Sequence, residues 1–128
     1  MLQESIRYLR IYALIQKEAS RRDPRGSEAV SDYRVRETYR DASLVEVRLQ
    51  TGRRNQIRLQ ARLHGHPLVG ERRYAIDPAP PRPIRFPRQA LHAHRLSFRH
   101  PSDGRLMEFE APLPDDFVEL LARLRAKP

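Results

Sequence analysis

One stretch of the sequence decides the fold class more than any other, because its pattern could form either a strand or a helix. It runs from residue 51 to residue 74 and reads TGRRNQIRLQARLHGHPLVGERRY. Its apolar residues alternate with polar ones, which alone favours a strand; they are Ile57, Leu59, Ala61 and Leu63. Leu, Arg, Gln and Ala are nevertheless good helix formers, Thr51 suits an N-cap, and Gly65 suits a helix stop. We therefore expect a helix over residues 53–64.

The same stretch carries six arginines against a single acid, Glu71. In a helix, Arg54, Arg58 and Arg62 would lie on one face, where like charges at this spacing repel by roughly 0.2–0.5 kcal/mol per pair. A face of this kind suits an anion, since the planar guanidinium matches phosphate and carboxylate geometry. It is equally compatible with a solvated arginine face, and the stripe alone leaves both interpretations open.

The charge of the whole chain is carried almost entirely by arginine. The formal net charge is +9, and Lys17 and Lys127 are its lysines. This balance favours a polyanionic partner, with RNA or DNA as the first candidate. The absence of cysteine excludes a disulfide framework and a cysteine–zinc site.

Length and hydropathy set the broad class of the protein. The 128 residues suffice for a single domain, residues 1–128, with a real core. The chain has no apolar run of membrane-spanning length, and its first residues lack the apolar region of a signal peptide. We therefore expect a soluble, cytoplasmic protein without a membrane partner, and the sequence does not indicate an oligomeric state.

The remaining segments predict a mixed order of helices and strands. Apolar residues at helical spacing predict a helix over residues 5–19, and alternation predicts an antiparallel hairpin of strands 27–39 and 44–50. A proline-rich loop over residues 77–87 separates the central helix from a second hairpin, strands 90–99 and 106–110.

The clearest element is the last helix, which begins near Asp115. Two acids favour its N-terminus, and an apolar stripe at helical spacing follows; the stripe is Phe117, Leu120, Leu121 and Leu124. The whole order predicts an α+β fold, with a mixed, mainly antiparallel sheet and flanking helices.

Two H-x-H pairs raise the possibility of a metal site: His64 with His66, and His92 with His94. On a strand, such a pair places both rings on one face, which can suit zinc. No cysteine or evident acidic ligand accompanies either pair, so we expect strand and helix-end histidines and no metal. A serine nucleophile and a glycine-rich phosphate loop have no support in the sequence.

Several motifs in order resemble the RluA-like RNA pseudouridine synthases. Residues 51–58, TGRRNQIR, are similar to the family's T-G-R-x-H-Q-I-R, and residues 64–74 are similar to its G-H-P-x-x-G-D-x-x-Y. The resemblance continues at QALHA, residues 89–93, and at FEAPLP, residues 109–114. It covers residues 27–126, whereas residues 1–26 match poorly, and it implies the fold of these synthases.

The chain departs from the family pattern in two respects. Asn55 and Gln60 stand where the family usually has histidine, and neither side chain can titrate. The family's nucleophilic aspartate lies in an H-R-L-D segment upstream of T-G-R, and residues 1–50 contain nothing similar. We therefore interpret the chain as the C-terminal portion of a synthase catalytic domain and expect it to be inactive alone.

The resemblance implies an activity on RNA and the residues involved. The family isomerises uridine to pseudouridine in structured RNA, such as rRNA or tRNA, without a cofactor or metal. Arg58 would pair with the absent aspartate, so here it should be exposed or paired with Glu71 or a solvent anion. Ile57 would form an apolar wall of the base pocket, or else pack in the core.

Other residues have weaker assignments. The RNA-binding candidates are Arg53, Arg54, Asn55, Gln56, Arg62, Arg72 and Arg73. Tyr74 and His92 would be core residues or lie at the pocket rim. The main alternative function is a non-catalytic RNA-binding module on a synthase scaffold. A basic structural protein of a ribonucleoprotein would explain the charge but not the motif series.

Overall fold

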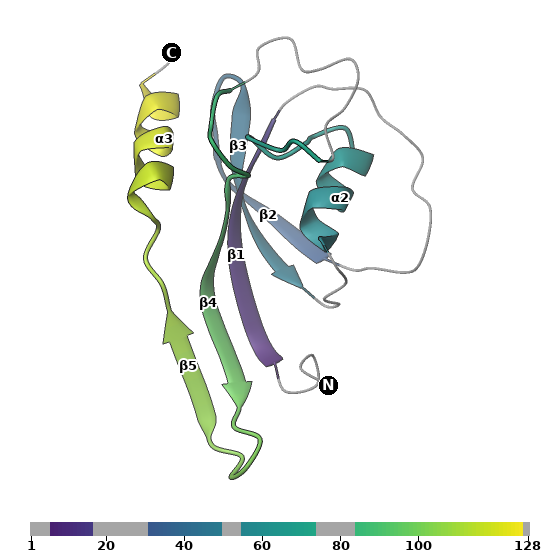
Figure 1. The fold of residues 1–128 in the computed structure, drawn as a ribbon, viewed down its shortest axis with the longest axis vertical. Helices are drawn as coiled ribbons and strands as arrows, with labels where there is room; N and C mark the ends of the chain where they lie inside the picture. Colours follow the sequence, from purple (N-terminus) through teal and green to yellow (C-terminus); the bar gives the residue numbers. More distant parts are fainter. Residues whose placement is uncertain (1–5, 17–30, 50–54, 74–83, 127–128) are drawn as a thin grey trace.

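The computed structural model describes residues 6–16, 31–49, 55–73 and 84–126 (Figure 1). In these ranges the chain forms five strands and two helices. In chain order they are β1 (Ile6–Gln16), β2 (Ser31–Thr38), β3 (Ala42–Leu49), α2 (Gln56–Leu63), β4 (Leu91–Arg99), β5 (Leu106–Glu110) and α3 (Asp115–Arg125).

The strands form one sheet in the order β2-β3-β1-β4-β5, and all neighbouring strands are antiparallel. The sheet confirms the predicted α+β class, and both predicted hairpins are present as β2–β3 and β4–β5. Residues 27–30 and 50 of the predicted strands, and residues 77–83 of the proline-rich loop, lie outside the described residues.

The predicted first helix over residues 5–19 is wrong, because residues 6–16 form the central strand β1. Ala13 pairs with Val45 of β3 on one side and with Leu91 of β4 on the other. Ala13 and Leu14 are fully buried, so the strand is covered on both faces. A strand buried on both faces reads as a continuous apolar run, and its pattern then does not distinguish it from a buried helix.

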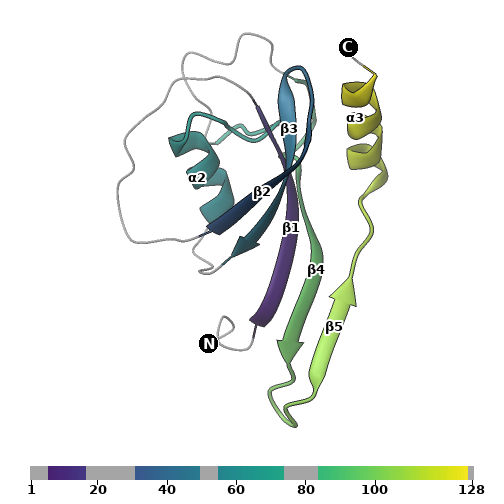
Figure 2. The same cartoon turned by 180° about the vertical axis from the view of Figure 1, so that it is seen from behind.

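The two helices cover opposite faces of the sheet, as both views show (Figures 1 and 2). One core cluster joins Leu14 of β1 to α3, and the other joins Ala13 to Ile57 and Ala61 of α2. Successive residues of a strand point to opposite faces, so β1 contributes to both cores. The sheet is therefore the middle layer of three.

Helix α3 confirms the stripe that the sequence predicted. Its buried residues are Phe117, Leu120, Leu121 and Leu124. Each large side chain of this kind stabilises the fold by about 1.5–3 kcal/mol on burial. At the end of the helix, Arg125 donates to both carboxylate oxygens of Glu37 on β2, at 2.9 and 2.6 Å, and this guanidinium holds the pKa of the Glu37 carboxyl below its ordinary value.

Two segments outside the sheet are fixed to β1 by backbone hydrogen bonds. Leu14 N–H donates to the carbonyl of Ala90 at 3.0 Å, and the Leu14 carbonyl accepts from Val69 N–H at 2.9 Å. Ala90 N–H in turn donates to the Val69 carbonyl at 2.8 Å. These bonds hold the loop after α2 against the loop before β4, at one end of the central strand.

Gly70 is required where these two loops meet. Its φ is +80°, and a Cβ atom at this position would lie 1.8 Å from the carbonyl oxygen of Arg88. We therefore expect Gly70→Ala to lower the free energy of unfolding by about 3 kcal/mol or more, from backbone strain together with the forced loop shift.

Gly104 provides a matched control for this substitution. It has a similar φ of +75°, but a Cβ atom there meets nothing within 4 Å. Gly104→Ala should therefore cost only the strain of the left-handed conformation, about 1–2 kcal/mol. Urea unfolding of both variants measures the difference, and equal losses would contradict a requirement for the close approach at Gly70.

Candidate functional site

Helix α2 is shorter than the sequence predicted. It begins at Gln56 rather than residue 53, and its N-cap is Asn55, which has a left-handed backbone with φ 53° and ψ 30°. Thr51, the predicted cap, lies outside the described residues together with Arg53 and Arg54. Of the predicted arginine stripe, Arg58 and Arg62 lie on the helix.

The predicted stop of α2 at Gly65 is confirmed. Gly65 has φ 79°, and its N–H donates to the carbonyl of Arg62 at 3.0 Å. His66 N–H donates to the carbonyl of Ala61 at 2.9 Å. This pair of bonds is a Schellman motif, in which a glycine takes the left-handed position and the last carbonyls of the helix are satisfied.

A polar network fixes α2 to the start of β2. The Gln56 side-chain amide donates to the Ser31 hydroxyl at 2.7 Å, and that hydroxyl donates to Gln60 Oε1, also at 2.7 Å. The Tyr33 hydroxyl donates to the same oxygen at 3.0 Å. Partial desolvation of its hydroxyl raises the pKa of Tyr33 to about 12. Gln60, at a position where the family usually has histidine, thus accepts two hydroxyl protons.

Below the network, Ile57 and Ala61 pack into the sheet. Their exposed fractions are 4% and 5%, and they belong to the core cluster of β1 and β3. Apolar packing and the polar network act on adjacent faces of the same short helix. Together they determine how the first turn of α2 is placed over the sheet.

Arg58 forms a bidentate ion pair with Glu71. Arg58 Nε donates to Oε2 at 2.7 Å, and Arg58 Nη2 donates to Oε1 at 2.6 Å. The side chains are 18% and 1% exposed, respectively. The backbone N–H of Arg73 donates to the same carboxylate at 3.1 Å. Of the arrangements expected for Arg58, the structure shows the pair with Glu71.

The start of α2 lines an open pocket of about 280 Å³. Residues 55–58 form one side, and the remaining lining residues come from β3, β4 and the loop before β4. Those residues are Leu49, Leu91 and Gln89. Apolar walls with a few converging polar groups suit a small ring with hydrogen-bonding edges, although the volume is at the low end of the ~300–1,000 Å³ usual for ligand sites.

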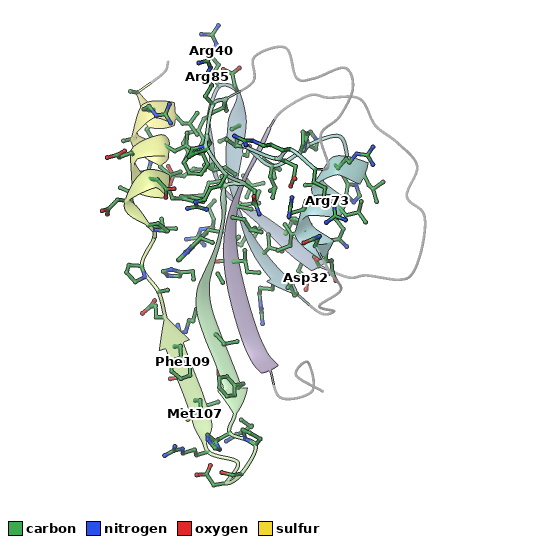
Figure 3. All side chains as sticks on the ribbon, in the orientation of Figure 1. Asp32, Arg40, Arg73, Arg85, Met107 and Phe109 are labelled. Carbon is green, nitrogen blue, oxygen red and sulfur yellow. The ribbon has the colours of Figure 1, made fainter. Side chains whose placement is uncertain are left out.

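Of the predicted site residues that the structure describes, four line the pocket, two are exposed after Glu71, and Arg62 lies later on α2, outside the pocket lining. Ile57, Arg58, Asn55 and Gln56 line the pocket, and Ile57 is also a core residue. Arg72 and Arg73 are exposed just after Glu71, and Figure 3 shows Arg73 beside α2. Gln89 was missed as a pocket residue, and the only sequence signal for it was its place in the QALHA motif.

The histidines of β4 are engaged by the backbone. His92 Nε2 and His94 Nδ1 lie 2.9 and 2.8 Å from the carbonyl oxygen of Ala111, so each of these nitrogens donates an N–H to it. His92 is half-buried and is not among the pocket residues, and Tyr74 lies outside the described residues. Within the described ranges, no group of three or more histidine or acidic side chains is placed to hold a metal.

Neither helix in the described part of the chain is long and apolar enough to cross a membrane.

The left-handed backbone of Asn55 leads to a test of its role. Asparagine and glycine tolerate this conformation, whereas a β-branched residue is strained in it. We expect Asn55→Gly to change the free energy of unfolding by about 0.5 kcal/mol or less, and Asn55→Val to lower it by about 1–2 kcal/mol. Thermal or urea unfolding distinguishes the two variants. Equal losses in both would assign the stabilisation to the side chain rather than to the backbone.

Known proteins resemble this chain in sequence. No protein-family profile matches it. "Ribosomal large subunit pseudouridine synthase D" of Haemophilus influenzae is 46% identical over 112 residues, which cover 80% of this chain and 35% of that protein. "Uncharacterized RNA pseudouridine synthase YlyB" of Bacillus subtilis is 46% identical over 100 residues, covering 78% of this chain and 32% of that protein. The chain thus spans about a third of the length of these relatives.

Solved structures show the same fold. "Human RNA Pseudouridylate Synthase Domain Containing 4" superposes with a TM-score of 0.71 at 19% identity, over 97% of this chain and 64% of that one. "Human RNA Pseudouridylate Synthase Domain Containing 1" gives 0.64 at 23% identity, over 94% of this chain and 66% of that one. In sequence and in fold, this chain is therefore homologous to a part of the RluA-like RNA pseudouridine synthases, the family that its motifs indicated.

Proposed function

We propose that this chain carries one wall of the catalytic pocket of an RNA pseudouridine synthase. The observation that supports the proposal most strongly is Arg58, which lies in the T-G-R-x-x-Q-I-R motif and is anchored beside an open pocket with Ile57. The substrate would be a uridine in structured RNA. Large-subunit rRNA is the first candidate, because the Haemophilus relative is named for it.

The reaction needs a uridine to leave its stack and enter the pocket. The glycosidic N1–C1′ bond then breaks, the uracil turns, and a bond forms from C5 to the same sugar carbon, while C5 releases its proton and N1 gains one. Flipping a base out of a stem costs a few kcal/mol, which protein contacts to the RNA backbone offset. In this proposal Ile57 forms the apolar wall against the ring, while Asn55 and Gln56 lie at the pocket edge.

Arg58 would act on the nucleophilic carboxylate. By the family resemblance, an aspartate from an H-R-L-D segment attacks the nucleotide, and the paired arginine keeps it ionised and oriented. Residues 1–50 of this chain lack that segment. The nucleophile would therefore be supplied by sequence outside these residues, and this chain alone is expected to be inactive.

A second candidate function is a non-catalytic RNA-binding module, which the missing aspartate segment favours. Joining this chain to the upstream part of a relative's synthase domain distinguishes the two. A reconstituted domain that releases tritium from RNA carrying 5-tritiated uridine supports the enzyme. A domain that binds RNA but releases no tritium supports the binding module.

RNA binding should depend on arginines near the pocket. Arg72 is exposed on the α2 side, whereas Arg123 is exposed on α3, on the opposite face of the sheet. We expect Arg72→Gln to reduce the slope of log affinity against log salt by about 1, and Arg123→Gln to leave it unchanged. Fluorescence anisotropy at several salt concentrations measures both slopes. An affinity that does not depend on salt would contradict a phosphate-driven mode.

Arg58 should be the described residue most closely tied to chemistry. Lysine stays charged at neutral pH but cannot hold a carboxylate by two parallel bonds. In the reconstituted synthase we expect Arg58→Lys to lower the single-turnover rate by about 100-fold or more, with RNA affinity nearly unchanged. Arg62→Lys, later in the same helix, should weaken affinity modestly and preserve the rate. If Arg58→Lys weakened only binding, Arg58 would be a phosphate contact.

A further inference from the structure

The Arg58–Glu71 pair fixes the orientation of the guanidinium. Both Glu71 oxygens are used, one on Nε at 2.7 Å and one on Nη2 at 2.6 Å. A planar group held by one hydrogen bond can rotate about that bond, whereas two parallel bonds along one edge prevent this rotation. Nη1, on the other side of the guanidinium, is not part of this pair.

Glu71 is itself held by the backbone around it. Its N–H donates to the carbonyl of Leu68 at 3.1 Å, and its carboxylate accepts from Arg73 N–H at 3.1 Å. Val69, two residues before Glu71, is bonded to Leu14 of the central strand and to Ala90. The carboxylate therefore follows closely on a backbone segment that is bonded to the central strand and to the loop before β4.

A second pair in the chain has the same contacts but a different environment. Arg125 and Glu37 are joined by two bonds of 2.9 and 2.6 Å, with side chains 50% and 38% exposed. The Glu71 side chain is only 1% exposed. A carboxylate taken out of water contributes little net stability for its desolvation cost, so its burial is better explained by orientation than by stability.

We propose that Glu71 is a positioning residue for Arg58. Its two bonds fix the plane of the guanidinium at the edge of the pocket that Arg58 lines, where an anion bound in the pocket would meet it. This inference rests on the proposed function, in which that anion is the nucleophilic carboxylate. Glu71 acts only through Arg58 and does not touch the substrate.

The first test compares three variants in the reconstituted synthase. Glu71→Gln loses one of the two acceptors and should lower the single-turnover rate on the order of 10- to 100-fold, with RNA affinity within about twofold of the wild type. Glu71→Asp keeps the carboxylate that the family motif has at this position and should recover most of the rate. Glu37→Gln breaks the matched exposed pair and should leave the rate unchanged.

A double variant shows whether Glu71 acts through Arg58. If it does, Arg58→Lys together with Glu71→Gln should be no slower than Arg58→Lys alone, because the second change removes nothing further. Losses that multiply would assign Glu71 an independent role and overturn the proposal. A Glu71→Gln enzyme with the wild-type rate would also overturn it.

A spectroscopic measurement on the 128-residue chain separates this inference from the proposed function. The Arg58 side-chain Nε–H resonance should be sharp and slow to exchange with solvent in the wild type and in Glu37→Gln, and lost in Glu71→Gln. If the reconstituted wild type is inactive, the proposed function fails, and this resonance still decides whether Glu71 orients Arg58. If Arg58→Lys is slow while Glu71→Gln is not, only the role of Glu71 fails.

Discussion

The central strand β1 is buried on both faces, and both cores of the protein pack against it. Leu14 points into the core beneath α3, while Ala13 points into the core beneath α2. The edges of the strand are bonded to β3 and β4, and Leu14 also binds the backbone of Val69 and Ala90. The pocket residues Ile57 and Leu91 belong to elements that pack against or pair with β1. The position of the pocket wall therefore depends on this buried strand.

The same burial explains what the sequence could and could not predict. The alternation of the hairpin strands and the apolar stripe of α3 are visible in the sequence, and these predictions were confirmed. The period of β1 is hidden because residues 11–15 are apolar in succession, and the predicted helix was wrong. Its identity as a strand depends on partners 30 or more residues away, such as Val45 and Ala93.

The site was predictable in composition but not in geometry. The motif drew attention to Arg58 and Ile57, yet left three arrangements open for Arg58. The choice of Glu71 follows from the loop that Gly70 and Val69 hold against β1, which no local pattern encodes. The bonds from Ser31 and Tyr33 to Gln60 likewise join segments far apart in the chain.

The two departures from the family pattern keep physical roles that do not require titration. Position 55 needs a residue that tolerates a left-handed backbone, and asparagine and histidine are both enriched there. Gln60 Oε1 accepts the hydroxyl protons of both Ser31 and Tyr33 of β2, whereas the single acceptor nitrogen of a neutral imidazole accepts one.

The pair with Glu71 fixes the orientation of the Arg58 guanidinium and at the same time reduces its attraction for distant anions. The carboxylate compensates the charge of Arg58, so this guanidinium contributes little to the long-range field on which the proposed RNA binding would depend. In the proposed function, that field comes from exposed arginines such as Arg72, which is not among the residues that line the pocket. In the proposed function, Arg58 instead acts on an anion in direct contact with its oriented guanidinium. In the proposed function, exposed arginines bind RNA and Arg58 acts in the reaction. Substitutions can then change one of these properties without changing the other.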